Sequence, residues 1–273
     1  MPVVRLEYRN VTMRFADARG AGPLMADRGV SFAVRDAEVV SLIGPSGCGK
    51  STLLNIGSGL TAPSEGAAFV DGARVAGPNA QVAFMLQKDL LLPWRTVAEN
   101  VMFGVEIQGL PVKERRRRAE NLLVNFKLAE FSRHYPHQLS GGMRQRVALA
   151  RTLAVDPHVL LLDEPFSAVD AQTRMVLQHD LAQTLKQANK TALLITHDLA
   201  EAVTLSDRVL VMSRRPGTII DEIAIELPQR ENPMARRRAA RFGDHVAQLM
   251  DRLDIAHADI ADAALDREAE TAT

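Results

Sequence analysis

The sequence predicts an α/β fold with a parallel-sheet core, an antiparallel β subdomain near the start of the chain and a helical insertion. Short apolar runs typical of buried parallel strands recur along the chain, and several are followed by helical patterns. Residues 3–8 and 30–34 mix β-branched and apolar side chains around a polar, Gly-containing stretch at residues 16–23, which favours antiparallel pairing. From about residue 90 to residue 154 helical periodicity replaces the strand pattern, which indicates the insertion.

The individual elements follow from local patterns. Residues 39–43 form a short apolar run that Gly44 ends, and a helix should begin near Lys50. Helical patterns in the insertion include residues 112–126 and 141–153. Further strand candidates lie at residues 82–86, 159–162, 192–196 and 209–212.

Beyond residue 230 a polar and then basic stretch leads to an apolar stripe with three- and four-residue spacing. The stripe consists of Phe242, Val246, Leu249, Met250 and Leu253. We expect it to pack back on the domain, with binding of a regulator as the alternative. The predicted organisation is one domain over residues 1–230, with a helical subdomain inserted at about 90–154, and a helical extension over 231–273. The Ala- and acid-rich end, from Asp259, is expected to be disordered.

Composition narrows the classes of function. With 273 residues and 47% hydrophobic side chains the chain can bury a sizeable core, and 33 basic residues balance 33 acidic ones. The chain therefore has no excess of positive charge to attract nucleic acid, and we expect no nucleic-acid partner. The single cysteine, Cys48, excludes an internal disulfide and fits a reducing compartment. No apolar run approaches the roughly 20 residues that span a bilayer, and we expect a cytoplasmic protein.

A phosphate-binding motif lies at residues 44–52, GPSGCGKST, which match the pattern G-x-x-x-x-G-K-[ST] between a predicted strand and a predicted helix. Glycines let backbone N–H groups turn inward around phosphates, and the helix N-terminus adds positive charge. Lys50 can bridge the β- and γ-phosphates, and the Ser51 hydroxyl can ligate Mg²⁺. The alternative is a Gly-rich turn with an ordinary surface lysine, which the full motif and its context disfavour. The residues expected to bind the nucleotide here are Gly44, Pro45, Ser46, Gly47, Cys48, Gly49, Lys50, Ser51 and Thr52.

Two acidic residues follow the apolar run VLLL at residues 159–162. Asp163 and Glu164 would lie at the C-terminal edge of the sheet, where ligands of parallel sheets collect. There Asp163 can help to hold Mg²⁺, and Glu164 can orient or deprotonate an attacking water. On their own, two acids after an apolar strand would more often belong to a helix N-terminus or a solvated turn. Together with the phosphate loop, they indicate a catalytic role.

A third motif, LSGGMRQR at residues 139–146, helps to decide which class of phosphate-loop protein this chain belongs to. Ser140, Gly141 and Gly142 offer small side chains and free N–H groups at the start of a helix, which makes a second anion site. Taken alone, the motif could equally be a Ser N-cap with a Gly turn.

With these motifs in order, residues 4–228 resemble the ABC ATPase family. The resemblance implies a RecA-like P-loop NTPase core of the ABC ATPase type, with ATP and Mg²⁺ as cofactors. Met143 replaces the Gln of the usual LSGGQ signature, and Ala37 replaces a usual Gly. The family forms a head-to-tail dimer of two copies, in which Ser140 and Gly142 of one copy close over the ATP held by the other.

The resemblance also implies roles for single residues outside these motifs. Gln87 falls at the Q-loop position that senses Mg²⁺ and the permease, and His197 at the switch histidine that holds the γ-phosphate and the attacking water. Asp170 ends the segment Ser167-Ala168-Val169-Asp170, which resembles the D-loop that links the two sites. Phe15 falls where an aromatic ring stacks on adenine, although a lone Phe after a strand is more often core. Lys50, Glu164 and His197 are thus the candidate catalytic residues, and Ser51, Gln87 and Asp163 the candidate Mg²⁺ ligands.

Two segments, KDLLLPWRTVAENVMFGVEIQG (residues 88–109) and DRVLVMSRRPGTIIDEIAIELPQR (residues 207–230), are similar to the nitrate/sulfonate/taurine group of importers. In that group the ATPase works at the cytoplasmic side of the inner membrane on a two-copy transmembrane permease, to which a periplasmic binding protein delivers a small solute. Pro93 and Trp94 would then lie near the groove for the permease, although a core role for Trp94 is nearly as well supported. This makes import of a small solute, such as an organic anion, our expectation.

Three other classes of function compete with this expectation. A non-hydrolysing binding module is disfavoured because Lys50, Asp163, Glu164 and His197 are all present. An ATPase of an exporter or of a lipid-transport system carries the same motifs, and the two importer-like segments weigh against it. A soluble ABC ATPase that remodels nucleic acid or ribosomes often has a long coiled coil between the Q-loop and the signature. Here only residues 88–138 separate the two motifs, which leaves room for a compact insertion alone.

Overall fold

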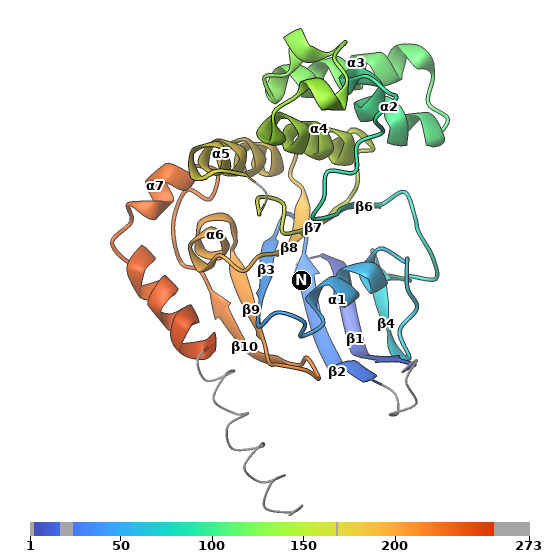
Figure 1. Ribbon diagram of the computed structural model, residues 1–273. Coiled ribbons are helices and arrows are strands. Elements are labelled where there is room, and N and C mark those ends of the chain that lie inside the picture. The colour runs from blue at the N-terminus through green and yellow to red at the C-terminus, as the bar shows by residue number, and fades with distance from the viewer. Residues whose placement is uncertain (1–2, 17–23, 168, 254–273) are drawn as a thin grey trace, which may run out of the picture.

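The computed structural model describes residues 3–16, 24–167 and 169–253. Within these residues, ten strands form two sheets, with the helices packed between and around them (Figure 1). The strands are β1 (Val4–Phe15), β2 (Leu24–Arg35), β3 (Val39–Ile43), β4 (Glu65–Val70), β5 (Ala73–Arg74), β6 (Val82–Met85), β7 (Val159–Asp163), β8 (Thr191–Ile195), β9 (Arg208–Met212) and β10 (Ile219–Ala224). The helices are α1 (Lys50–Gly57), α2 (Val97–Ile107), α3 (Val112–Asn125), α4 (Gly141–Ala154), α5 (Ala171–Gln187), α6 (Leu199–Leu205) and α7 (Pro233–Arg237), with 3-10 turns at Ala129–Phe131 and Pro136–Gln138.

The larger sheet has the strand order β10-β9-β3-β8-β7-β6 and is parallel except for β10, which pairs antiparallel with β9. Strands β3, β7, β8 and β9 are buried along their whole length, as expected for a parallel sheet that is covered on both faces. The predicted parallel core is therefore confirmed, with strand ends that differ from the predicted ones by about one residue.

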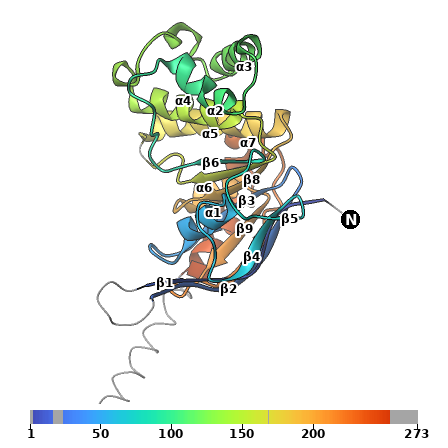
Figure 2. The ribbon, with the colours of Figure 1, turned by 90° about the vertical axis from the view of Figure 1, so that its right-hand side faces the viewer.

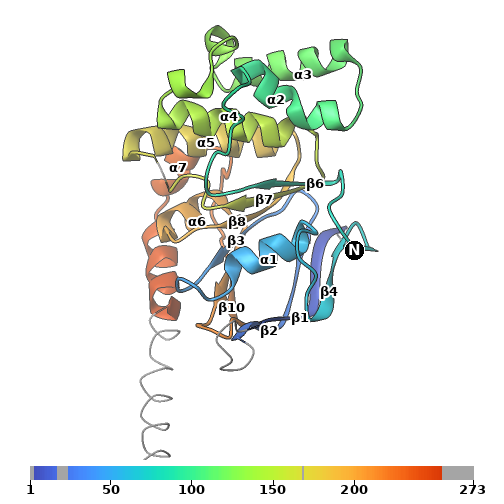
Figure 3. The same ribbon diagram turned by 45° about the vertical axis from the view of Figure 1, so that its right-hand side comes forward.

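The smaller sheet is antiparallel, with the order β2-β1-β4-β5. Helix α1 lies between the two sheets (Figure 3), because its apolar residues Leu53, Leu54 and Ile56 share one core cluster with residues of both. The strands β1 and β2 are each 12 residues long and extend well beyond the predicted runs. Of the polar stretch between them, residues 17–23 lie outside the described residues.

The helical insertion consists of α2, α3 and α4, which stack at the far end of the molecule from the small sheet (Figures 1 and 2). Helix α2 begins with a capping box in which the Glu99 N–H donates to the Thr96 hydroxyl and the Thr96 N–H donates to the Glu99 carboxylate. Helix α4 connects the insertion to the body, because its apolar side chains belong to the same core as β7, β8 and α5. Among the described residues no helix is both long and apolar enough to cross a membrane.

The chain ends, within the described residues, in α7 and a helix over 242–253. Leu249 is fully buried, and Phe242, Val246 and Leu253 pack beside it against β9, β10 and α6. The stripe therefore packs on the domain, except for Met250, which is exposed. The predicted acid-rich end from Asp259 lies outside the described residues.

Candidate active site

The phosphate loop, residues 44–49, joins β3 to α1 at the carboxyl edge of the parallel sheet. Gly49 is the N-cap of α1 and has a left-handed backbone, with φ of 116°. A Cβ atom at this position would lie 1.9 Å from an oxygen of the Asp27 side chain, so only glycine fits. The close approach of β2 to the loop thus explains why the chain needs glycine at this position.

Lys50 is the first residue of α1, and its side chain lies across the mouth of the loop. The ammonium donates to the carbonyl oxygens of Gly44 (2.7 Å) and Pro45 (2.9 Å), and the Cys48 sulfur lies 3.7 Å away. The cation therefore sits beside the backbone that would surround a phosphate, where its charge can act on an anion.

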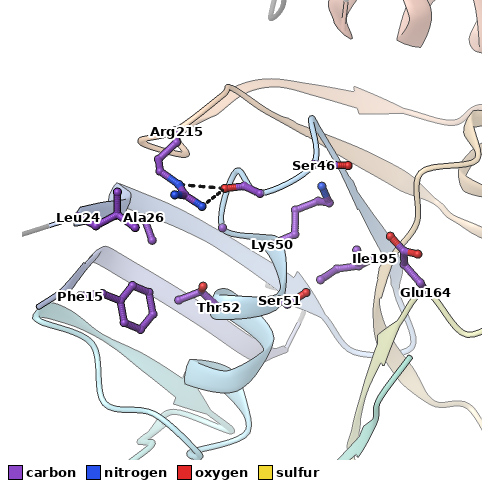
Figure 4. Close-up of a pocket in the computed structure, with 12 residues that line it drawn as sticks. Phe15, Leu24, Ala26, Ser46, Lys50, Ser51, Thr52, Glu164, Ile195 and Arg215 are labelled. Atoms are coloured by element: carbon purple, nitrogen blue, oxygen red, sulfur yellow. Dashed lines mark hydrogen bonds between the residues drawn. The ribbon is translucent and has the colours of Figure 1, made fainter. Parts of the chain in front are cut away.

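The two acids occupy the predicted edge of the sheet. Asp163 is the last residue of β7, and burial raises the pKa of its carboxyl, which a hydrogen bond from Ser51 partly opposes. Glu164 follows with a positive φ of 45°, and its N–H donates to the carbonyl of Ile195 at the end of β8. This uncommon backbone conformation, held by β8, turns the Glu164 side chain into the cavity (Figure 4).

Glu164 is the meeting point of three segments that are far apart in the sequence. Its Oε2 accepts a hydrogen bond from Gln87 Nε2 at 3.1 Å, and His197 Nδ1 lies 3.2 Å from the same oxygen. Gln87 comes shortly after β6, Glu164 directly after β7 and His197 two residues after β8. Because these are neighbouring parallel strands, their ends bring together a carboxylate, an amide and an imidazole, which can hold and activate a water molecule.

Glu164 lines a cavity of about 250 Å³ together with residues of the phosphate loop (Figure 4). Gln87, Asp163 and His197 are not among the described residues that line it. Phe15, the last residue of β1, is 41% exposed and stands at one end, opposite the acidic edge. An exposed ring beside a phosphate loop suits a nucleotide base better than a core role. The predicted residues that line the cavity are Phe15, Ser46, Gly47, Gly49, Lys50, Ser51, Thr52 and Glu164.

Other predicted residues of the loop are placed differently. Gly44, Pro45 and Cys48 are not among the described residues that line the cavity. The Cys48 side chain is buried on the inner side of the loop, and this burial raises the pKa of its thiol.

The signature residues also lie outside this cavity. Ser140 is the N-cap of α4, and its hydroxyl accepts a hydrogen bond from the Met143 N–H at 3.3 Å. Gly141 and Gln87 line a second cavity of about 590 Å³, and a Cβ at Gly142 would collide with Thr173 of α5. Asp170 caps α5 by accepting from the Thr173 N–H at 3.0 Å; Ala168, before it in the D-loop, is outside the described residues. The helix starts at the phosphate loop and at the signature therefore do not share a cavity.

Arg215, in the turn between β9 and β10, is not among the predicted site residues. Its guanidinium donates two hydrogen bonds, at 3.1 and 2.7 Å, to the carbonyl oxygen of Gly47 and lines the cavity (Figure 4). None of the described carboxylates forms an ion pair with it. No local motif marks this residue, because its position over the loop depends on a contact across 168 positions of sequence. The cavity is completed by three apolar residues that the motifs also did not indicate, Leu24, Ala26 and Ile195.

The residues present fit a hard divalent cation. The Ser51 hydroxyl, the Asp163 carboxylate and the Gln87 amide offer the oxygen ligands that Mg²⁺ prefers. The part of the chain that the structure describes contains no group of three or more His, Cys, Asp or Glu residues arranged to hold a metal on their own. Phosphate and water oxygens would have to complete the coordination, as is usual for Mg²⁺ at nucleotide sites.

The sequence and the structure are both similar to those of known proteins. A family model described as ABC transporter matches residues 28–167. An uncharacterized ABC transporter ATP-binding protein of Methanocaldococcus jannaschii, MJ0412, is 46% identical over 224 residues, which are 82% of this chain and 83% of the relative. The taurine import ATP-binding protein TauB of Yersinia pestis is 44% identical over 221 residues, 81% of this chain and 86% of its own.

Among solved structures, the ATP-binding cassette MJ0796 in a dimeric post-hydrolysis state with ADP and Pi superposes with a TM-score of 0.72 and 31% sequence identity. The match covers 81% of this chain and 99% of the cassette. A second dimeric structure of MJ0796, described as a bacterial ABC transporter cassette, matches with the same TM-score and identity.

Proposed function

The chain belongs to the family of ABC transporter ATP-binding proteins, and from this premise we propose that it hydrolyses ATP to energise the import of a small solute through a separate permease. The observation that carries the proposal is the group formed by Glu164, Gln87 and His197 at the edge of the phosphate-loop cavity. This arrangement has the parts that in-line attack of water on a γ-phosphate requires.

In the proposed mechanism the adenine lies against Phe15 and the phosphates lie in the loop, with Lys50 at the β- and γ-phosphates. Mg²⁺, held by Ser51 and Asp163 with Gln87 nearby, would neutralise charge that develops on the phosphates. Glu164 orients the attacking water and accepts its proton, and His197 donates to the transferred group. Since Gln87 and His197 both contact Glu164, a movement of either residue can switch the catalytic carboxylate on or off.

Two copies would complete the sites. Ser140 and Gly142 start a helix with free N–H groups but lie outside the cavity of their own chain. In a head-to-tail dimer the signature of one copy would cover the nucleotide held by the other, and the dimeric structures of the similar cassette MJ0796 support this. Binding of ATP would then close the dimer, and hydrolysis would open it.

The permease would dock at the insertion. Trp94 is 71% exposed, which argues against a core role, and Leu90 is exposed beside the second cavity, which Gln87 also lines. Exposed apolar side chains next to a residue that touches Glu164 connect a docking surface to the catalytic carboxylate. The chain would thus act from the cytoplasmic side of the membrane, and a periplasmic binding protein would supply the solute.

The proposed class of transported solute and the proposed direction of transport are based on the TauB relatives. Several taurine import ATP-binding proteins (TauB) are 44% identical to this chain. We therefore propose a small organic anion of the sulfonate type. The test is reconstitution of the chain with its permease in liposomes: ATP on the side of this chain should drive labelled taurine or another sulfonate toward that side. Movement away from the ATP side would identify an exporter instead.

The position of Arg215 predicts a role in nucleotide binding, which can be tested without measuring hydrolysis. Its guanidinium contacts the loop at Gly47 and lines the same cavity as Phe15, so we expect it to contact the ribose and α-phosphate. Arg215→Ala should raise the dissociation constant of Mg-ADP about tenfold, since a charge-assisted hydrogen bond to phosphate is lost. Isothermal titration calorimetry measures this change.

Two variants separate a contact with phosphate from support of the loop. Arg215→Gln retains a donor for the Gly47 carbonyl without the charge, and should bind nearly as weakly as the Ala variant. Arg14→Ala removes another guanidinium, next to Phe15, which is paired with Glu65 at 2.6 Å and should leave ADP affinity unchanged. Wild-type affinity in Arg215→Ala would contradict the assignment.

A further inference from the structure

The C-terminal segment packs against the helix that follows the candidate switch histidine. Helix α6 begins two residues after His197, and α7 lies beside both α5 and α6 (Figure 1). Polar side chains in this contact are buried, although the surrounding core is apolar. Buried polar groups are retained only with hydrogen-bond partners, so their partners identify what the contact holds in place.

Arg237, the last residue of α7, donates one hydrogen bond to the Gln178 side-chain oxygen of α5 at 2.8 Å and one to the Thr204 hydroxyl of α6 at 3.2 Å. Gln178 is fully buried, and its Nε2 donates to the Glu201 carboxylate of α6 at 3.0 Å. Because Arg237 occupies the amide oxygen, the amide must present its N–H₂ group to Glu201. The arginine therefore sets the direction of the next hydrogen bond.

Glu201 continues the chain to the end of β8. It is 3% exposed, and its carboxylate accepts from the Thr196 hydroxyl as well as from Gln178. Burial raises the pKa of Glu201 to about 7, and these two hydrogen bonds oppose that rise. The Thr196 hydroxyl in turn accepts from the Asp198 N–H at 3.0 Å.

Thr196 and Asp198 are the neighbours of His197 in sequence. The hydroxyl of the first is bonded to the N–H of the second, which closes a tight turn around the histidine. Asp198 is also the N-cap of α6, because its carboxylate accepts from the Glu201 N–H at 3.0 Å. The backbone that carries His197 is thus fixed from its inner side, while the imidazole reaches Glu164 on the other side.

We propose that Arg237 is a positioning residue for ATP hydrolysis, which holds His197 in place through Gln178, Glu201 and Thr196. This inference rests on the proposed function, because it assigns the C-terminal segment a role through His197. A ligand or protein that displaces α7 would loosen the turn around His197 and slow hydrolysis without touching the nucleotide.

The test compares Arg237→Ala with Arg238→Ala in the full-length chain. Arg238 is the next residue and is exposed, so its loss controls for charge and for helix propensity. We expect kcat for ATP to fall about tenfold in Arg237→Ala, since a misplaced catalytic group loses rate steeply. KM should stay within about twofold, because the residues that bind the nucleotide are untouched. Arg237→Lys, which can still donate to Gln178, should recover most of the rate.

A second readout is independent of turnover. The ring resonance of His197 among the seven histidines can be assigned with His197→Ala and followed by NMR. It should shift or broaden in Arg237→Ala and stay unchanged in Arg238→Ala. Equal kcat values and an unmoved resonance would overturn the inference, whereas a wild-type chain with no ATP turnover would overturn the proposed function itself.

Discussion

Glu164→Gln should lower steady-state ATP turnover by about 100-fold or more, because an amide cannot accept a proton from the attacking water. The substitution keeps the shape of the side chain and its hydrogen bond with Gln87, so the phosphate loop should bind ATP as before. With hydrolysis blocked, the closed dimer should persist, and size-exclusion chromatography should show an ATP-dependent dimer of the variant. Phosphate release by wild type and variant gives the rate.

Glu130→Gln is the matched control. Glu130 lies in the 3-10 turn Ala129–Phe131 and is exposed, so this change should alter neither turnover nor assembly. Turnover of Glu164→Gln within about tenfold of wild type would contradict the general-base role. A variant that loses turnover but never dimerises in ATP would leave the catalytic assignment standing and contradict the head-to-tail dimer.

Asp27→Asn should stabilise the fold, and increasingly so as pH rises. Asp27 is fully buried beneath Gly49, and neither of its carboxylate oxygens has a hydrogen-bond partner among the described residues. Burial raises the pKa of this carboxyl to about 7, although the positive charge of Arg215 lowers it somewhat. The ionised form of Asp27 is therefore disfavoured in the folded protein.

The sign follows from proton linkage. The unfolded chain ionises Asp27 near pH 4, whereas the folded chain retains the proton up to about pH 7. Between these values the folded state binds more protons, so stability of the wild type falls as pH rises and levels off above pH 7. Asparagine carries no charge, and the variant should gain roughly 3 kcal/mol over the wild type between pH 5 and pH 8.

Thermal unfolding at pH 5 and pH 8 measures this gain, which corresponds to a relative rise in Tm of roughly 5 to 10 °C for a chain of this size. Asp244→Asn removes an exposed carboxyl from the C-terminal helix and should leave the difference between the two pH values unchanged. An equal response of Asp27→Asn and wild type to pH would contradict the raised pKa of the Asp27 carboxyl.

Sequence patterns did not predict the strands whose conformation depends on pairing with a neighbouring strand. Strand β4 contains Gly66 and two alanines, which have low β-propensity, and it is extended because it pairs with β1. Strand β10 is an edge strand with acidic residues, and its pairing with β9 sets its conformation. The predicted strands β3, β7, β8 and β9, in contrast, consist mostly of apolar residues, and this composition favours burial.

The chemistry of the site divides in the same way. The sequence alone determined the family, the phosphate loop and the acids after β7, because each of these depends on residues that are contiguous in the chain, whose spacing is itself the signal. Only the tertiary structure revealed that Gln87 and His197 share one oxygen of Glu164 and that Asp27 lies against the loop. The same holds for the contacts of Arg215 with Gly47 and of Arg237 with Gln178, which join residues 168 and 59 positions apart. A single arginine or aspartate carries no local pattern, and its role arises from what packing places beside it.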